Sequence, residues 1–288
     1  MTRLRPVAAA LAAVLLAAVL WEVVKVAAPD AGVHVGGASI LPRTDAVAMP
    51  HVWDVVQRTL QPETSAAGAP SVLSSMLHAC WFTLGVAAVG WALGVVAGFA
   101  LAVLMQRWRV AEESLEPWLV LSQTVPLVAL APLVVGWGGR IHLGGLEWQK
   151  WMSVALIASY LAFFPVAVGA LRGLQSPAAA QVDLFRAQAA GWGRTLVRLR
   201  IPASVPHLLP ALRLGAATAV VGAIVAEVST GTKGGIGRLI ISYAQSASGD
   251  PAKPWAAIAA AALLGLVAAG LVGLIGLGLR RFRHTEVS

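Results

Sequence analysis

Polar side chains are rare in the apolar stretches of this sequence, and those present could line a path for a solute. In a bilayer an uncompensated polar group is costly, so such residues tend to face a cavity, a pore or a neighbouring helix. The candidates for a translocation path are Gln123, Thr124, Tyr160, Arg213, Thr218 and Glu227. Binding and passing a solute is the chemistry that this set suggests.

Some of these residues allow two interpretations. Gln123 and Thr124 precede Pro126, and carbonyls freed by that proline could line a cavity. Hydrogen bonding between helices is the alternative for both side chains. Arg213 could extend toward the membrane surface or attract an anionic solute.

Residues for catalysis or metal binding do not gather anywhere in the sequence. Cys80 is the only cysteine, which excludes disulfides and cysteine-rich metal sites within one chain. His78 is interpreted as a residue at the boundary of an apolar stretch. The sequence has no Gly-x-x-x-x-Gly-Lys-Ser/Thr pattern, and GGIG (residues 234–237) has no strand before it and predicts a tight turn instead. We therefore expect no catalytic residue, no metal, no cofactor in this chain and no ATP hydrolysis by it.

The composition places the chain in a membrane. Of 288 residues, 58% are hydrophobic and 12% are charged, whereas soluble proteins carry about 25% charged residues. The mean hydropathy is +0.77. The net charge of +8 comes from arginines and lysines beside apolar stretches, so membrane topology explains it and no nucleic-acid partner is expected.

The apolar pattern predicts an all-α, polytopic membrane protein with six transmembrane helices. A helix needs about 20 apolar residues to cross a bilayer, and the stretches that meet this are 6–28, 73–105, 117–137, 151–173, 206–228 and 255–279. The second is long enough to tilt. Pro126 and Pro132 predict a kink in the third. Gly90, Gly94 and Gly98 predict a face for close helix packing in the second.

The spans divide the chain into three parts. Residues 1–28 are predicted to be a retained N-terminal transmembrane helix rather than a cleaved signal peptide, because Pro29 follows the small-residue site. Residues 29–70 form an outer loop with a short surface helix near residues 49–60. Residues 71–288 are predicted to form a core of five transmembrane helices. Arginines and lysines are denser on the side of both termini, which predicts that these are cytoplasmic.

The core includes a basic, amphipathic insert within residues 175–205, between the fourth and fifth spans. Gly191 and Gly193 predict a break into two short helices, and Pro202 and Pro206 predict the end of the insert. Such a segment could lie on anionic lipid or dock a cytoplasmic partner through Trp192. Its apolar stripe consists of Val182, Phe185, Ala189, Trp192, Leu196 and Leu199.

This insert resembles the cytoplasmic Glu-Ala-Ala loop of ABC importer permeases, the binding-protein-dependent inner-membrane component family. Asp183 stands at the acidic position and Ile201-Pro202 at the closing Leu-Pro pair. Leu184 and Phe185 replace the alanines, and Ala189 replaces the glycine. Residues 40–42, 122–139 and 220–240 look like the corresponding segments of the branch for sulfonates, nitrate and pyrimidine precursors.

The resemblance implies a permease subunit in the inner or plasma membrane, coupled through the insert to ATP hydrolysis elsewhere. Two ATPase subunits would bind ATP and Mg, an extracytoplasmic solute-binding protein would deliver a small organic or anionic solute, and a second permease, identical or paired, would complete the path among membrane lipid. The residues assigned to ATPase coupling are Asp183, Phe185, Arg186, Ala189, Ala190, Gly191, Trp192, Gly193, Arg194, Leu196 and Pro202.

Two rival functions have their own sequence requirements. A secondary transporter driven by an ion gradient would normally show an internal repeat and paired intramembrane acids or broken helices. An intramembrane enzyme would need a nucleophile with a base or metal ligands. Glu227 is an isolated acid near the end of a span. It could be a gate residue, an ion-pair partner of Lys233 or Arg238, or an interfacial residue.

Overall fold

The structure is a computed structural model and describes residues 4–35, 38–41, 43–140, 142–143 and 146–278. Two compact units are described one at a time. Unit 1 comprises Met1–His78 and Leu239–Ala260, and unit 2 comprises Ala79–Arg238 and Ala261–Ser288. Helices α3 (Val72–Arg107), α10 (Ile236–Gln245) and α11 (Ala252–Gly278) contribute residues to both units.

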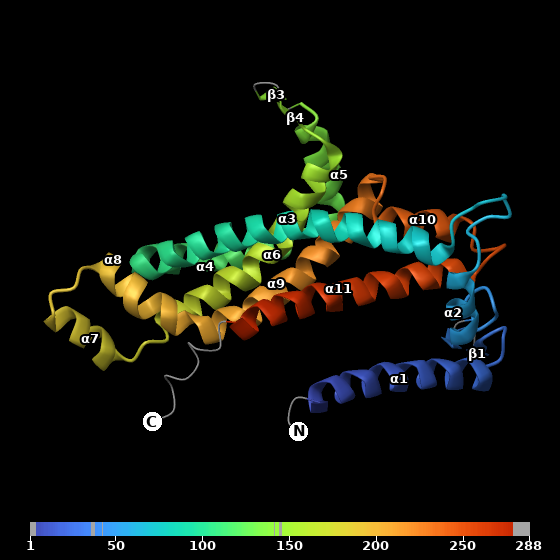
Figure 1. Cartoon of the computed structure of the whole chain (residues 1–288), viewed down its shortest axis with the longest axis horizontal. Coiled ribbons are helices and arrows are strands. Elements are labelled where there is room, and N and C mark those ends of the chain that lie inside the picture. Colours follow the sequence, from blue (N-terminus) through green and yellow to red (C-terminus); the bar gives the residue numbers. More distant parts are fainter. Residues whose placement is uncertain (1–3, 36–37, 42, 141, 144–145, 279–288) are drawn as a thin grey trace. The chain divides into compact units, whose positions relative to one another are not determined.

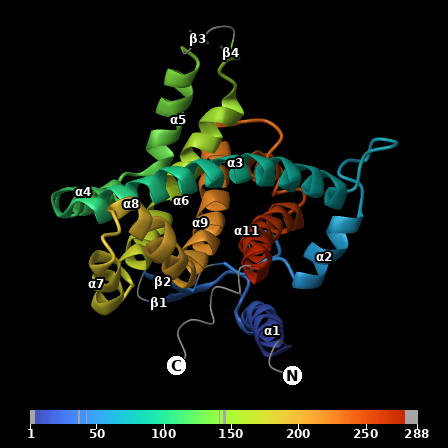
Figure 2. The same cartoon turned by 60° about the vertical axis from the view of Figure 1, so that its left-hand side comes forward.

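Unit 2 consists mainly of helices, and Figure 1 labels most of them. They are α4 (Arg109–Ser122), α5 (Leu127–Gly138), α6 (Lys150–Gln175), α7 (Ala179–Ala187), α8 (Trp192–Thr195), η1 (Leu196–Arg200) and α9 (Ile201–Thr230). A ribbon of strands β3 (His142–Leu143) and β4 (Leu146–Glu147) joins α5 to α6 (Figure 2).

In the described part of the chain, four helical segments are long and apolar enough to cross a membrane. They are Val72–Arg107, Lys150–Gln175, Trp192–Thr230 and Ala252–Gly276, and the number is up to five if α4 and α5 form one broken span. The structure therefore agrees with a polytopic helical membrane protein. The prediction of six spans also requires residues 6–28, where α1 (Leu4–Ala27) forms a helix, and it stays a prediction.

Close contacts between helix backbones hold unit 2 together. An ideal Cβ on Gly90 would lie 2.5 Å from the Ala158 Cβ, and one on Gly94 would lie 2.8 Å from the Ala162 Cβ. A Cβ on Gly98 would lie 2.6 Å from the Phe163 carbonyl oxygen. The predicted glycine face of α3 is thus confirmed, and α6 is the helix that it contacts.

The third predicted span is broken rather than kinked. Helix α4 ends at Ser122, α5 begins at Leu127, and their axes differ by 99°. Pro126 lacks an N–H and disfavours helical backbone at Val125, which explains a break at this point. Pro132 lies inside α5 without ending it. Helix α5 alone is about 18 Å long at 1.5 Å per residue.

The insert forms two helices, as the glycines predict, but the positions of the break and of the end differ from the prediction. The chain turns between α7 and α8, where Ala189 has a φ of 53°, and Gly193 lies inside α8. Pro202 and Pro206 do not end the insert, because α8, η1 and α9 continue as one rod. The Ile201 N–H bonds to the Leu196 carbonyl, and this wider π-helical turn relieves the clash that Pro202 would cause.

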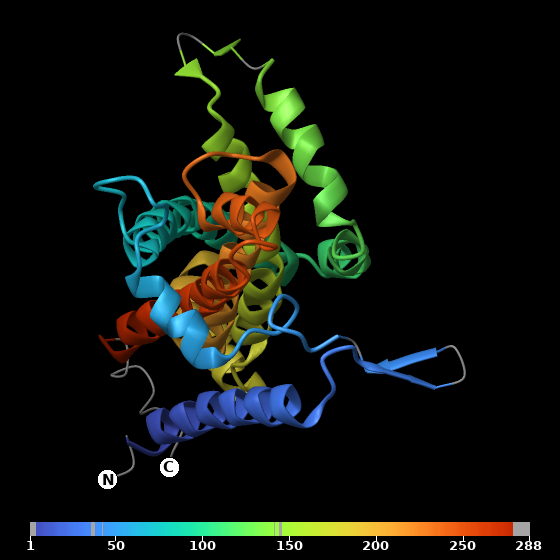
Figure 3. The same ribbon diagram turned by 90° about the vertical axis from the view of Figure 1, so that its right-hand side faces the viewer.

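Unit 1 contains α1, the ribbon of β1 (Val33–Val35) and β2 (Ala38–Leu41), and α2 (Val52–Leu60). Figure 3 shows α1 leading into this antiparallel ribbon. Helix α2 lies where the valine spacing predicts a surface helix, and none of its residues is buried. The two short ribbons are an addition to the expected all-α architecture.

Candidate translocation and coupling sites

Glu227 lies at the end of α9 and is completely buried. Its Oε1 accepts a hydrogen bond of 2.8 Å from the Thr83 hydroxyl, and its Oε2 accepts one of 2.9 Å from the Gly237 N–H. The Thr83 oxygen in turn accepts the Ile236 N–H at 2.9 Å. These acceptors satisfy the first N–H groups of α10, which have no partner within that helix. We call this arrangement the Glu227 cap.

The glycines of the GGIG segment make room for this carboxylate. A Cβ on Gly235 would collide with the carboxylate group of Glu227, and one on Gly237 would lie 2.6 Å from the Ile224 carbonyl oxygen. Gly231 and Gly234 have φ values of 65° and 100°, which favour glycine. The predicted tight turn is confirmed, and two of its glycines are needed for the cap rather than for the turn.

The environment of Glu227 differs from two of its sequence interpretations. It is buried rather than interfacial, and among the described residues it forms no ion pair with Lys233 or Arg238. Thr83 is not among the residues that the sequence predicts for a site. A threonine within the apolar run of α3 is the signal that could have found it.

The break between α4 and α5 adjoins a cavity of about 330 Å³ between α3, α5 and α6. The Tyr160 hydroxyl donates a hydrogen bond to the Ser122 carbonyl at the break. Irregular backbone at membrane depth is tolerated where it lies in protein or lines a cavity. The residues that line this cavity are Gly94, Ala97, Leu130, Val134, Leu156, Ile157, Ser159, Tyr160 and Phe163.

The other path candidates lie in different surroundings. Gln123 and Thr124 are exposed at the break, and the Thr124 hydroxyl donates to the Leu121 carbonyl at 2.8 Å. The Thr218 hydroxyl lies 3.1 Å from the Leu161 carbonyl oxygen, which makes it a contact between α9 and α6. The Arg213 guanidinium lies 3.4 Å from the Gly273 carbonyl oxygen on α11. The structure thus groups Tyr160 with the break and separates Thr218, Arg213 and Glu227 from it.

Trp192, the residue expected to anchor a partner, contacts its own chain. Its indole N–H donates to Gln106 Oε1 at 3.2 Å, and the Arg107 guanidinium lies 4.9 Å from the ring centroid. We call this the Trp192 clamp. Leu196, one turn further on, is buried with Ala102 and other residues of α3, α4 and α6. The apolar face of α8 and η1 is therefore occupied within unit 2.

Helix α7 is the exposed part of the insert. No side chain of this helix is buried, and Leu184 is 57% exposed. Arg186 pairs with Asp183 at 3.0 Å, a surface contact of little energetic weight. Ala189 adopts left-handed backbone where the resemblance places glycine, a conformation that is strained for alanine. Phe185 and Ala190 are partly buried, whereas Gly191, Gly193 and Arg194 are exposed.

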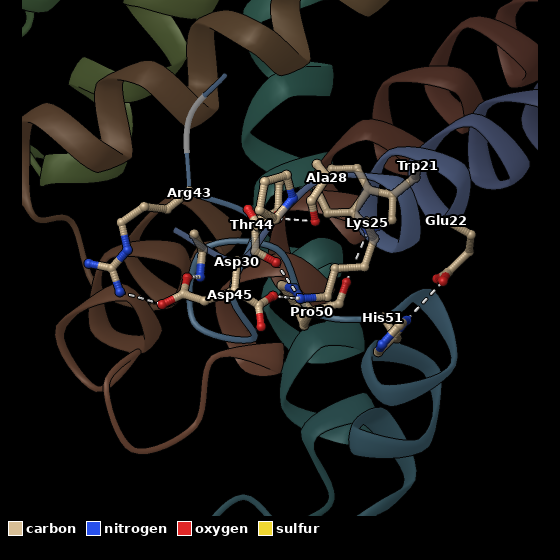
Figure 4. A network of polar contacts seen from close by, with 12 residues as sticks. Trp21, Glu22, Lys25, Ala28, Asp30, Arg43, Thr44, Asp45, Pro50 and His51 are labelled. Atoms are coloured by element: carbon tan, nitrogen blue, oxygen red, sulfur yellow. Dashed lines mark hydrogen bonds and ion pairs between the residues drawn. The ribbon is translucent and has the colours of Figure 1, made fainter. Parts of the chain in front are cut away.

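In unit 1, the last two turns of α1 carry a polar network that Figure 4 shows. The Trp21 N–H donates to the Pro50 carbonyl at 3.0 Å. Glu22 Oε1 accepts the Val52 N–H at 2.6 Å, and its Oε2 lies 2.9 Å from His51 Nδ1. The bond from the Val52 N–H to Glu22 caps the start of α2, which has no cap from its own residues. We call it the Glu22 cap.

Part of this sequence is similar to the sequences of curated relatives. The formylaminopyrimidine transport permease protein of Halalkalibacterium halodurans is 36% identical over 145 residues, which are 50% of this chain and 54% of the relative. The putative aliphatic sulfonates transport permease protein of Bacillus subtilis is 29% identical over 159 residues, 55% of this chain and 54% of the relative. The riboflavin transport system permease protein of Chloroflexus aurantiacus is 31% identical over 134 residues, 46% of each chain. The matches to these relatives span about half of their length.

The family comparison covers more of the chain. A family model described as the binding-protein-dependent transport system inner membrane component matches residues 94–281. This range includes the residues that line the cavity beside the break and the whole insert. It also includes every residue of the Glu227 cap except Thr83. Because the match covers more than half of the 288 residues, the chain belongs to the family of binding-protein-dependent transport system inner membrane components.

Proposed function

We propose that this chain is the permease subunit of an ATP-driven ABC importer. The observation that carries the proposal is the exposed helix α7, joined by a short turn to the continuous rod of α8, η1 and α9. An ATPase subunit that binds α7 would move a helix long enough to cross the membrane. Family membership and the names of the relatives support this function.

The proposal places α7 and both termini in the cytoplasm and requires several partners. Two ATPase subunits would bind ATP and Mg, a solute-binding protein would deliver the solute on the opposite side, and a second permease would complete the path. Within the insert, Asp183, Leu184 and Arg186 are exposed and available to an ATPase subunit. Trp192 and Leu196 act instead by fixing the insert to the long helices.

For the solute we propose a small organic molecule with an uncharged planar ring. The cavity beside the break offers the hydroxyl-bearing residues Ser159 and Tyr160, and the rings of Tyr160 and Phe163 lie 5.9 Å apart. None of the described residues that line it is charged. A sulfonate would lose its hydration there without gaining a cation, whereas an aromatic ring could stack on the side chains.

The function is tested by reconstituting the chain in proteoliposomes with its partner ATPase and solute-binding protein. We expect ATP-dependent uptake, together with ATPase activity that the loaded binding protein stimulates. Uptake driven by an ion gradient without the ATPase would replace the proposal with a secondary transporter. For the solute, a thermal-shift screen of the binding protein should favour an aminopyrimidine over an alkylsulfonate, and the reverse order would contradict the uncharged ring.

A further inference from the structure

Helix α3 contacts the insert at its C-terminal end and the Glu227 cap through Thr83, about three turns after its first residue. We propose that α3 transmits movement of the insert to the corner between α9 and α10, with Trp192 and Thr83 as positioning residues. This inference rests on the proposed function, because it assumes that an ATPase moves the insert. Both contacts lie within unit 2.

At the first end, the Trp192 clamp joins the insert to the last turn of α3. A hydrogen bond to Gln106 and a cation–π contact with Arg107 hold the indole, and such contacts are directional as well as attractive. Leu196 packs in the same buried cluster as Ala102 and Met105 of α3. Any displacement of α8 is therefore passed to the end of α3 as well as to α9.

Between its two ends α3 is an unbroken helix. At about 1.5 Å per residue, the stretch from Thr83 to Gln106 is about 35 Å long, comparable with the hydrocarbon core of a bilayer at about 30 Å. It contains no proline. Gly90, Gly94 and Gly98 bring it directly onto the backbone of α6. Contacts of this kind lack long interlocking side chains, so α3 can slide along α6 as a rigid body.

At the second contact, Thr83 joins α3 to both α9 and α10. Its hydroxyl donates to Glu227 and accepts the Ile236 N–H, and all three residues are buried. Separating α3 from this corner would leave buried polar groups without partners, which is costly. The start of α10 must therefore follow α3.

The arrangement gives two rods that begin at the insert and meet at Glu227. One is α9, which continues covalently from α8, and the other is α3, which the Trp192 clamp joins to α8. With the clamp intact, both rods move together and the corner moves as a unit. Without the clamp, α9 moves alone and the displacement is not carried along α3 to Thr83.

The first test uses Cys80, the only cysteine of the chain, which lies on α3 one turn before Thr83 and is partly buried. In the complete transporter in proteoliposomes, the rate of Cys80 labelling by a maleimide is measured without nucleotide and with ATP plus vanadate. We expect the two rates to differ several-fold in the wild type. Trp192→Ala should abolish this difference while ATP hydrolysis persists, and Trp192→Phe, which keeps the ring and lacks the N–H, should reduce it.

Trp108→Ala is the matched control, because Trp108 directly follows α3 and is 55% exposed. It should keep the wild-type difference. If Trp192→Ala also keeps it, or if a transporting wild type shows no difference at Cys80, the role of α3 is overturned. A wild-type complex without ATP-dependent uptake would instead overturn the proposed function and, with it, this inference.

The second test removes the hydroxyl of Thr83. Thr83→Val keeps the shape of the side chain, and we expect uptake per ATP hydrolysed to fall about tenfold or more, as the loss of a buried hydrogen bond would allow. Thr83→Ser should restore the ratio because it retains the hydroxyl. A merely structural role would lower the amount of folded transporter and leave this ratio unchanged, and that result would contradict the proposal.

Discussion

Two carboxylates solve the same structural problem in different surroundings. Glu22 in unit 1 and Glu227 in unit 2 each lie near the end of a long helix, and each accepts a backbone N–H from the start of a short helix. Glu22 has 21% of its side chain exposed and pairs with His51, whereas Glu227 is completely buried and bonds to Thr83. Water can replace a lost partner at the first cap but not at the second.

This difference predicts the largest effect for loss of the buried carboxylate. Glu227→Ala leaves the Gly237 N–H and the Thr83 hydroxyl without their acceptor and opens a cavity, so we expect a loss of about 3–5 kcal/mol in stability. Thermal unfolding in detergent measures it. Glu227→Gln is the control, because its amide oxygen can still accept the Gly237 N–H, and it should cost less than half as much. Equal losses for the two variants would show that charge rather than hydrogen bonding matters.

The next effect concerns the space around Glu227. Gly235→Ala places a methyl group against the carboxylate and should cost about 1–3 kcal/mol through overpacking. The shorter side chain of Glu227→Asp should relieve part of this cost when the two changes are combined. A double-mutant cycle in the same unfolding assay checks this coupling. Strictly additive effects would mean that the glycine serves the turn rather than the cap.

A smaller effect is expected at the exposed cap. Glu22→Ala removes the acceptor for the Val52 N–H, and the loss of such a cap typically costs about 1 kcal/mol. Hydrogen exchange of the Val52 amide should accelerate, while that of the Gly237 amide stays unchanged. Glu22→Gln retains an acceptor and should protect Val52 nearly as well as the native residue. A loss as large as that of Glu227→Ala would remove the proposed contrast between the caps.

The smallest effect is expected at a buried polar group that lacks a partner. The Tyr243 hydroxyl in unit 1 is buried near Glu63 and Ser75 but forms no hydrogen bond of good geometry among the described residues. Burial, with a contribution from Glu63, raises the pKa of Tyr243, which keeps the phenol neutral. Tyr243→Phe should therefore change stability by about 0.5 kcal/mol or less, as thermal unfolding can show. A loss above about 1 kcal/mol would reveal a partner for the hydroxyl.

Local features of the sequence determined the elements of this protein. The long apolar runs predict helices that can cross a membrane, and the glycines predict two helices in the insert. Pro126 predicts a distortion at the place where the structure has a full break between α4 and α5. Each of these effects acts within a few residues, through burial of apolar surface, a missing N–H or the freedom of a glycine backbone. Pattern alone is therefore enough to detect them.

Only the tertiary structure decided which polar groups meet. Thr83 and Glu227 are 144 positions apart, and their contact depends on the rotation and register of α3 against α9, which apolar periodicity leaves open. The same holds for Trp192, whose amphipathic position fits a partner's groove as well as the end of α3. A hydrogen bond requires its partner within about 3 Å and in the right direction, and that condition is met only when the helices have packed.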